Sequence, residues 1–195
     1  MKMNGVGRAS KIVLVLVMVF ALFGGSSVFA EMGFEKGTSW VVDFDKNPLT
    51  DEIDLLIFTV DVDTLDGGSS FDAKLLGIRY SGEVLELVLS WSEYLADNDK
   101  VSLRFDGGEV IDMKWSLAEN KRGLFFPRRT RDIEEFIEKI LHAEKLVVGV
   151  TPWQKRQQIA QFEIAGLAKV IDPYLEDMGL EELRPVVDEI LADSD

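Results

Sequence analysis

The stretch that most constrains the fold is VSLRFDGGEVIDMKWSL, residues 101–117. Apolar and polar residues alternate on both sides of a Gly-Gly pair, which predicts two strands that each bury one face. A glycine pair between two such runs is typical of a hairpin turn. We expect the rest of the chain to pack around this hairpin.

The register of this hairpin follows from its loop length. A three-residue loop, 107–109, places Phe105 opposite Ile111 and Arg104 opposite Asp112, an opposite-charge pair across the strands. A two-residue loop would place Arg104 opposite the apolar Ile111 instead. Because a one-residue slip turns every side chain to the wrong face, the three-residue loop is favoured. The residues predicted to lie in the core are Phe105, Ile111, Met113 and Trp115.

A second hairpin is expected over residues 74–89. A two-residue loop at Ser81 and Gly82 would pair Ile78 with Leu85 and keep one face of the hairpin apolar. Shorter alternating or apolar runs predict further strands at residues 40–44, 53–62, 123–126, 146–150 and 159–164.

Two segments change to the helical period. Residues 131–142 carry apolar side chains at i, i+3, i+4, i+7 and i+8, one face of an amphipathic helix. The same period returns after Gly166, is interrupted at Pro173 and stops at Gly179, which predicts a C-terminal helix pair. The predicted class is therefore α+β: mainly antiparallel sheet, with hairpins 74–89 and 101–117, one mid-chain helix and the C-terminal pair.

The first thirty residues are typical of a secretory signal. Basic residues precede a short apolar run, Ile12 to Phe23, and V-F-A at 28–30 suits a cleavage site. Twelve apolar residues are too few for a spanning helix, which needs about 20. We expect a cleaved signal peptide at 1–30, a single α+β domain at 31–179, and an acidic C-terminal helix or tail at 180–195. The mature protein would be periplasmic or secreted, without stable membrane insertion; the alternative is an uncleaved anchor.

The mature chain would be strongly acidic. Three of the 21 basic residues and none of the 35 acidic ones precede Glu31, so the expected net charge is −17. Nucleic acid and anionic lipid both need a basic footprint, so neither is expected as a partner. A basic partner would fit, as would solubility alone. The chain has no cysteine, so its core and strand pairing must stabilise it without disulfides.

Catalytic patterns are sparse. His142 is the sole histidine, and its expected place at a helix C-terminus suits the helix dipole better than nucleophilic catalysis. Asp106 with Asp112, or Glu83 with Glu86, could be imagined as the carboxylate pair of an exported hydrolase. With 35 acidic residues such pairs arise by chance. No catalytic residue, cofactor or metal is assigned.

An aspartate-rich loop is the best ligand-like feature. Oxygen ligands at alternate positions suit calcium. Pro48 and Asp54 stand where a calcium loop has glycine and glutamate, and a solvated turn capped by its own side chains is the competing interpretation. The calcium candidates are Asp43, Asp45, Asn47, Asp51 and Asp54. A small basic cluster at Arg128, Arg129 and Arg131 is interpreted as a solvated helix entry, and a contact with an anion or a partner is the alternative.

Four runs of the sequence stand out together: L-x-x-R-Y at 76–80, VSLRFDGG at 101–108, LVVGVTPW at 146–153 and AQFEIAGLAKVIDPYLEDMGL at 160–180. These runs resemble the VasI/TagO family of exported accessory proteins associated with type VI secretion. Trp40 and PLTD at 48–51 resemble the family's opening block. The resemblance implies a periplasmic, non-catalytic accessory or binding protein with protein partners in the cell envelope.

The resemblance also has a departure. The family pattern carries a cysteine after the arginine of the first run and another before the final glycine. Here Tyr80 and Met178 stand at those positions. If the family cysteines are bridged, these positions are neighbours, and we expect a Met–aromatic contact in place of the covalent link.

Overall fold

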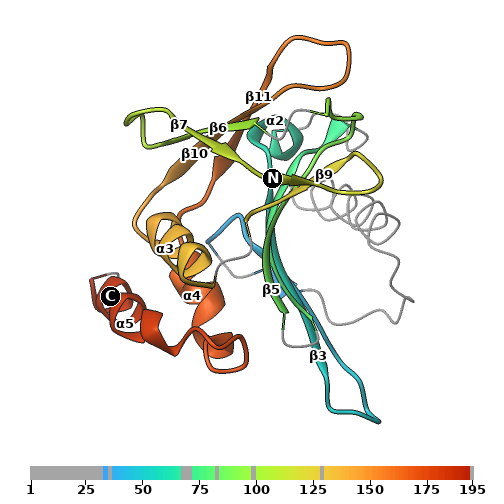
Figure 1. Ribbon diagram of the computed structural model, residues 1–195. Coiled ribbons are helices and arrows are strands. Elements are labelled where there is room, and N and C mark those ends of the chain that lie inside the picture. Colours follow the sequence, from blue (N-terminus) through green and yellow to red (C-terminus); the bar gives the residue numbers. More distant parts are fainter. Residues whose placement is uncertain are drawn as a thin grey trace, which may run out of the picture.

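The computed structural model describes residues 33–34, 37–66, 72–81, 84–97, 100–127 and 130–193 of the 195-residue chain. It contains two antiparallel sheets and a group of short helices, so the predicted α+β class is confirmed (Figure 1). The predicted signal peptide, residues 1–30, lies outside the described residues. No helix in the described part of the chain is both long and apolar enough to cross a membrane.

One sheet has seven strands in the order β1-β2-β3-β4-β5-β9-β8, and the other has four in the order β11-β10-β6-β7. The strands are β1 (Gly33–Phe34), β2 (Val41–Lys46), β3 (Ile53–Val60), β4 (Leu75–Ser81), β5 (Val84–Ser90), β6 (Lys100–Phe105), β7 (Ile111–Lys114), β8 (Ser116–Leu117), β9 (Gly123–Phe125), β10 (Lys145–Val150) and β11 (Gln158–Glu163). The helices are α2 (Val62–Leu65), α3 (Thr130–Leu141), α4 (Leu167–Ile171) and α5 (Arg184–Ala192), with 3-10 turns at Asp172–Tyr174 and Glu181–Leu183.

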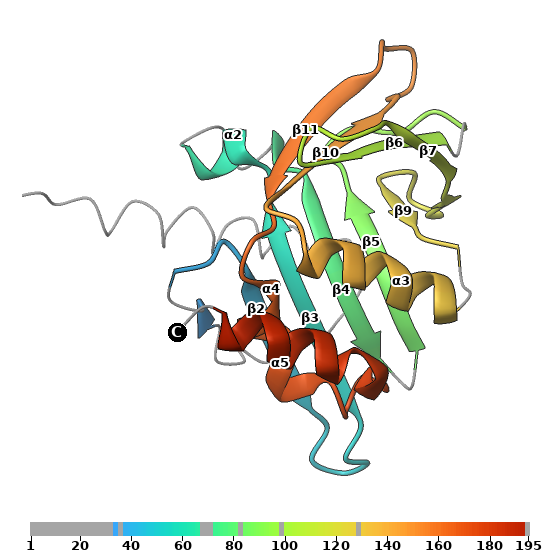
Figure 2. The ribbon, with the colours of Figure 1, turned by 90° about the vertical axis from the view of Figure 1, so that its left-hand side faces the viewer.

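The seven-stranded sheet is buried on both faces along β3. Leu55 and Ile57 point into the large core, whereas Phe58 and Val60 belong to a smaller cluster of buried side chains. Alternate residues of a strand point to opposite faces, so an almost continuously apolar strand has to be covered on both sides. Figure 2 shows α3 and α5 lying across strands β3, β4 and β5 on one face of the sheet.

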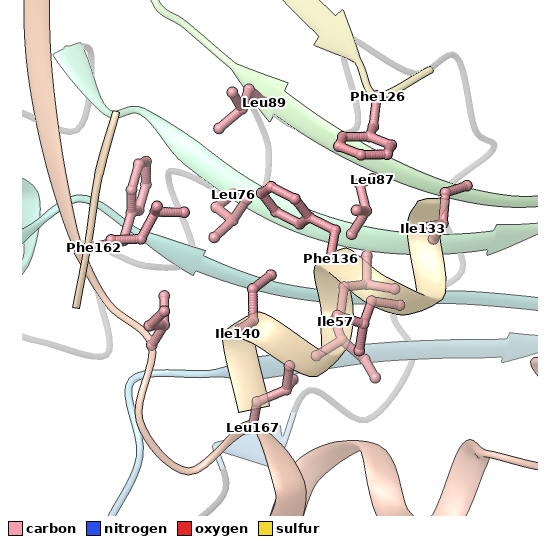
Figure 3. Close-up of a cluster of buried hydrophobic side chains, with 14 of the residues drawn as sticks. Ile57, Leu76, Leu87, Leu89, Phe126, Ile133, Phe136, Ile140, Phe162 and Leu167 are labelled. Carbon is pink, nitrogen blue, oxygen red and sulfur yellow. The ribbon is translucent and has the colours of Figure 1, made fainter. Parts of the chain in front are cut away.

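The large core lies between this sheet, the four-stranded sheet and the helices. The predicted mid-chain helix is α3, and its predicted inner face is buried: Ile133, Phe136, Ile137, Ile140 and Leu141. Figure 3 shows Ile133, Phe136 and Ile140 on α3 beside Leu87 of β5, Leu76 of β4 and Phe162 of β11. The apolar stripe of one helix thus joins both sheets.

The predicted register of the first hairpin is wrong by two residues. Leu103 pairs with Ile111 and Ser102 with Asp112, so Arg104 does not lie opposite Asp112. Arg104 instead donates from Nε to the carbonyl oxygen of Gly108 (2.8 Å) and from Nη2 to that of Gly107 (2.6 Å). These bonds hold a turn longer than the expected 107–109 loop.

The turn itself is fixed by a neighbouring strand. Asp106 and Gly107 both have positive φ (45° and 73°), and the Gly108 N–H donates to the carbonyl oxygen of Phe105 at 2.7 Å. Positive φ at both central residues is the pattern of a type I′ hairpin turn. The Asp106 carboxylate accepts from the backbone N–H groups of Glu144 (3.1 Å) and Lys145 (2.8 Å), just before and at the start of β10. A long-range contact therefore selects the turn.

The second hairpin is confirmed as β4 and β5, but its register is also shifted by two residues. Ile78 pairs with Leu87 and Ser81 with Val84, instead of the expected Ile78 with Leu85. The connecting residues are therefore 82–83, which lie outside the described residues.

Trp115 sits where the chain passes from one sheet to the other. The expected strand 111–117 is divided into β7, at the edge of the four-stranded sheet, and β8, at the edge of the seven-stranded sheet. Trp115, between them, is 1% exposed, as predicted for a core residue. Its burial therefore links the two sheets at a corner.

The C-terminal helix pair is also present. Pro173 lies in the 3-10 turn that follows α4, and Gly179 ends this segment with φ of +66°. Leu183 and Val187 are buried in the large core together with α3 and α4. The segment predicted as an acidic helix or tail therefore packs on the domain through its apolar face.

Candidate binding groove

An open groove of about 240 Å³ lies between the β6–β7 hairpin and α3. Its apolar lining consists of Leu103, Phe105, Ile111, Met113, Phe126, Pro127 and Phe136. Its polar lining consists of Asp132, Glu135 and Lys139, all from α3. A concave apolar surface with a few polar groups is the ordinary form of a binding site.

Packed aromatic rings form the inner side of this groove. The ring of Phe136 lies 4.9 Å from that of Phe126 and 5.6 Å from that of Phe105, centroid to centroid. Trp115 packs behind them, 5.2 Å from Phe126 in an edge-to-face arrangement. Such ring pairs contribute about 0.5–1.5 kcal/mol each beyond the burial of their area, so they stabilise this side of the groove.

The outer wall is formed by residues that the sequence assigned to the core. Ile111 is 38% exposed, and Phe105 and Met113 are half-buried. The prediction that these three are core residues is therefore wrong for Ile111 and only partly right for the other two. They do point to the inner face of the hairpin, but β7 is an edge strand and the groove opens beside it.

One stripe of α3 forms the facing wall. Asp132, Glu135, Phe136 and Lys139 follow the i, i+3, i+4, i+7 spacing, next to the fully buried stripe that contains Ile137. Glu135 is held by Arg131, whose Nε lies 3.2 Å from the Glu135 Oε1. Two carboxylates and one ammonium thus border the groove, and the Arg131 guanidinium pairs with one of the two carboxylates. Sequence reasoning missed this stripe because its polar residues matched a solvated helix face.

The calcium candidates do not converge on one point. Asp43 and Asp45 alternate on β2, and Asp45 pairs across the strands with Asp54. Asn47 accepts the N–H of Leu49 at 2.9 Å through its side-chain oxygen, which is the self-capped turn expected as the alternative. Within the described residues no group of three or more His, Cys, Asp or Glu side chains is placed to hold a metal ion.

Two of these aspartates have other surroundings. Asp51 pairs with Lys46, with 3.0 Å between Oδ1 and Nζ. Partial burial raises the pKa of the Asp43 carboxyl above its ordinary value of 3.8, and repulsion from Asp45 adds to this effect. A raised carboxyl pKa means that the folded protein disfavours the charged form of Asp43.

The carboxylates imagined as a hydrolase pair have structural partners. Asp106 caps the start of β10 as described above, and Asp112 accepts from the Ser102 hydroxyl at 2.7 Å and pairs with Lys100 at 2.9 Å. The Ser102 hydrogen bond, followed by that of Lys100, lowers the pKa of Asp112. Glu86 is buried beside Arg79, and Glu83 lies outside the described residues.

The remaining predicted residues occupy separate places. His142 is exposed directly after α3, and Arg128 and Arg129 lie outside the described residues. Met178 is 3% exposed in the large core, and Tyr80 packs against the same cluster from the end of β4. A direct contact between Met178 and Tyr80 stays a prediction.

The chain is thus a small α+β protein of two antiparallel sheets with an open, largely apolar groove. No protein-family model matches the chain, and no curated protein matches it. Among solved structures it is similar to invasion associated protein B from Bartonella henselae, with 10% sequence identity and a TM-score of 0.48. The match covers 73% of this chain and 95% of that one.

Proposed function

We propose that this protein is an exported, non-catalytic accessory protein that binds a protein partner in the cell envelope through the groove between β7 and α3. The observation that carries the proposal is the groove itself, because its apolar wall at Ile111 is open to solvent. The resemblance of several runs to the VasI/TagO family supports a role beside type VI secretion. The signal-like residues 1–30 support export to the periplasm.

The groove favours an extended peptide segment as its ligand. β7 is an edge strand, and a partner strand can pair with such an edge while its alternate side chains enter an adjacent pocket. Covering Ile111, Met113 and Phe105 would remove apolar surface from water, which is worth about 25 cal/mol per Å². An apolar segment therefore gains free energy by binding there.

The net charge of the chain favours a basic partner. At the groove, Asp132 and Lys139 offset each other and Glu135 pairs with Arg131, whereas the whole chain has a net charge of −14. Complementary charge accelerates encounter and disfavours partners of the wrong sign. The expected ligand is therefore a segment with alternating apolar residues and at least one lysine or arginine.

Site-specific photo-crosslinking in the producing bacterium tests the binding role. A photoreactive amino acid at position 111 should crosslink one envelope protein, and the same amino acid at Leu49 should not. Leu49 is 92% exposed and lies at the tip of the β2–β3 hairpin, so it controls for exposure alone. Absence of a protein adduct at position 111, or the same adducts at both positions, would contradict the proposal.

A matched pair of variants tests the groove more closely. Ile111→Asp places a charge in the groove wall, whereas Val110→Asp places it at a neighbouring residue that is 63% exposed and outside the lining. We expect Ile111→Asp alone to abolish partner binding and, if the family role applies, to reduce type VI secretion. Cell fractionation with intact-mass measurement tests export separately, since a mature chain that begins at Glu31 is expected.

A further inference from the structure

A second exposed surface lies away from the groove, beside the loop that joins β10 and β11. Tyr94 is 56% exposed and Trp153 is 60% exposed. The Trp153 backbone N–H donates to the Tyr94 carbonyl oxygen at 2.8 Å, and Leu95 forms a β-bridge with Pro152. In Figures 1 and 2 this loop projects from one end of the molecule. Two large aromatic side chains are thus held at one place on the surface by backbone contacts.

Arg122 completes this surface. Its guanidinium carbon lies 4.6 Å from the centroid of the Tyr94 ring, and the side chain is half-buried. We call Tyr94, Arg122 and Trp153 the aromatic–arginine patch. A guanidinium stacked on an aromatic ring keeps its edge available for a planar acceptor such as a carboxylate.

The guanidinium of Arg122 has unused hydrogen-bonding capacity. Its Nε is buried without an acceptor, and no ion pair involves it among the described residues. This is unexpected in a chain with 35 acidic and 21 basic residues. The buried Nε is closed to solvent, so the exposed part of this half-buried side chain is what is available to a carboxylate from another molecule.

The charges around the patch are already neutralised in pairs. Lys121 Nζ lies 2.9 Å from Asp97 Oδ1, and Lys155 Nζ lies 2.9 Å from Glu93 Oε2. The charges that these pairs leave are those of Arg122 and of Arg156, which is exposed in the same loop as Trp153. Their sign is opposite to that of the net charge of the whole chain.

We propose that the aromatic–arginine patch is a second docking surface, for an acidic segment of a protein partner. A carboxylate of that segment pairs with Arg122, and an adjacent apolar side chain packs on Trp153. Tryptophan, tyrosine and arginine are enriched among the few residues that dominate the binding energy at protein interfaces. This inference does not depend on the groove, because the patch shares no residue with the groove lining.

The native fluorescence of the chain reports on this surface directly. Of the four tryptophans, Trp40, Trp91 and Trp115 are at most 1% exposed, so acrylamide reaches mainly Trp153. The probes are three synthetic 12-residue peptides, heparin, and phosphatidylglycerol vesicles. The first peptide alternates glutamate with leucine and phenylalanine, the second has lysine for glutamate, and the third has serine for the apolar residues.

The expected result is that the acidic apolar peptide alone protects Trp153 from quenching. Arg122→Gln and Tyr94→Ala should each weaken that peptide by at least about tenfold, as for a hot-spot residue. Arg131→Gln, which removes an exposed arginine paired with Glu135, and Ile111→Asp in the groove should leave the affinity unchanged. Because Arg122 is half-buried, thermal melts confirm that its variant is folded, and Tyr94→Ala provides a second test.

Other outcomes overturn the proposal. No protection by the acidic apolar peptide, or equal losses with Arg122→Gln and Arg131→Gln, would mean that the patch is not a carboxylate site. Heparin or vesicles that protect Trp153 as well as the peptide does would mean a general anion or lipid surface. Failure of these tests would leave the groove proposal standing, since Ile111→Asp is measured separately.

Discussion

The corner at Trp115 gives the sharpest stability prediction. Its side chain is 1% exposed and packs edge-to-face against Phe126 and Phe136, at 5.2 and 5.9 Å. Its Nε1 is buried and has no acceptor among the described residues. Trp115→Ala and Trp115→Phe therefore separate the packing of the ring from the cost of its polar atom.

The two substitutions are expected to differ widely. Trp115→Ala leaves a cavity in the core and should lower the free energy of unfolding by about 3–5 kcal/mol. Trp115→Phe keeps one ring in place and also removes the unpaired donor, whose burial costs about 1–3 kcal/mol. Removing the donor offsets most of the stability that is lost with the smaller ring. We therefore expect the free energy of unfolding to change by less than about 1.5 kcal/mol, the range of mild core substitutions.

Urea unfolding followed by far-ultraviolet circular dichroism measures both changes without relying on tryptophan emission. The slope against urea should stay constant, so that a shift in midpoint reports stability. Trp153→Phe and Trp153→Ala are the matched controls, because Trp153 is 60% exposed and each change should stay within about 0.5 kcal/mol. A Trp115→Phe loss above about 3 kcal/mol, the level of a full core truncation, would mean that Nε1 is hydrogen-bonded in solution.

Three further predictions test the fold. Burial raises the pKa of Asp43, so its charge destabilises the folded protein once the pH exceeds the ordinary value of 3.8. Asp43→Asn should therefore raise the urea midpoint at neutral pH and leave it unchanged below pH 3.8. An increase in the midpoint at both pH values would contradict the predicted sign. Gly166 has φ of +82°, and an added Cβ would lie 2.6 Å from Thr38 Cγ2. In the same assay Gly166→Ala should therefore lower the free energy of unfolding by about 2–4 kcal/mol. A decrease below about 1 kcal/mol would refute the clash. A Tyr80→Cys, Met178→Cys double variant should oxidise to a bridge and gain about 2–4 kcal/mol, and a failure to crosslink would mean that the two positions are not neighbours.

Much of the architecture was determined by the sequence alone. The spacing of Ile133, Phe136, Ile137 and Ile140 predicted α3 and its inner face, and all four are buried. Alternation predicted the strands of both hairpins, and the α+β class followed from them. These features depend on local periodicity, which is written in consecutive residues.

The pairing of the strands was decided by tertiary contacts. Both predicted registers are wrong by two residues, and a two-residue slip keeps every side chain on its predicted face. Alternation therefore cannot distinguish the two registers. In the first hairpin the choice follows from Asp106, whose carboxylate binds the backbone at the start of β10, 39 residues further along the chain.

The groove could not be predicted for a related reason. Ile111 has the same alternation as Leu103, yet Leu103 is 1% exposed and Ile111 is 38% exposed. A strand's pattern states which way its side chains point, whereas burial depends on what packs against them. Because the chain turns at Trp115 into the other sheet, β7 stays at an edge and the space beside Ile111 is open, which only the arrangement of the two sheets determines.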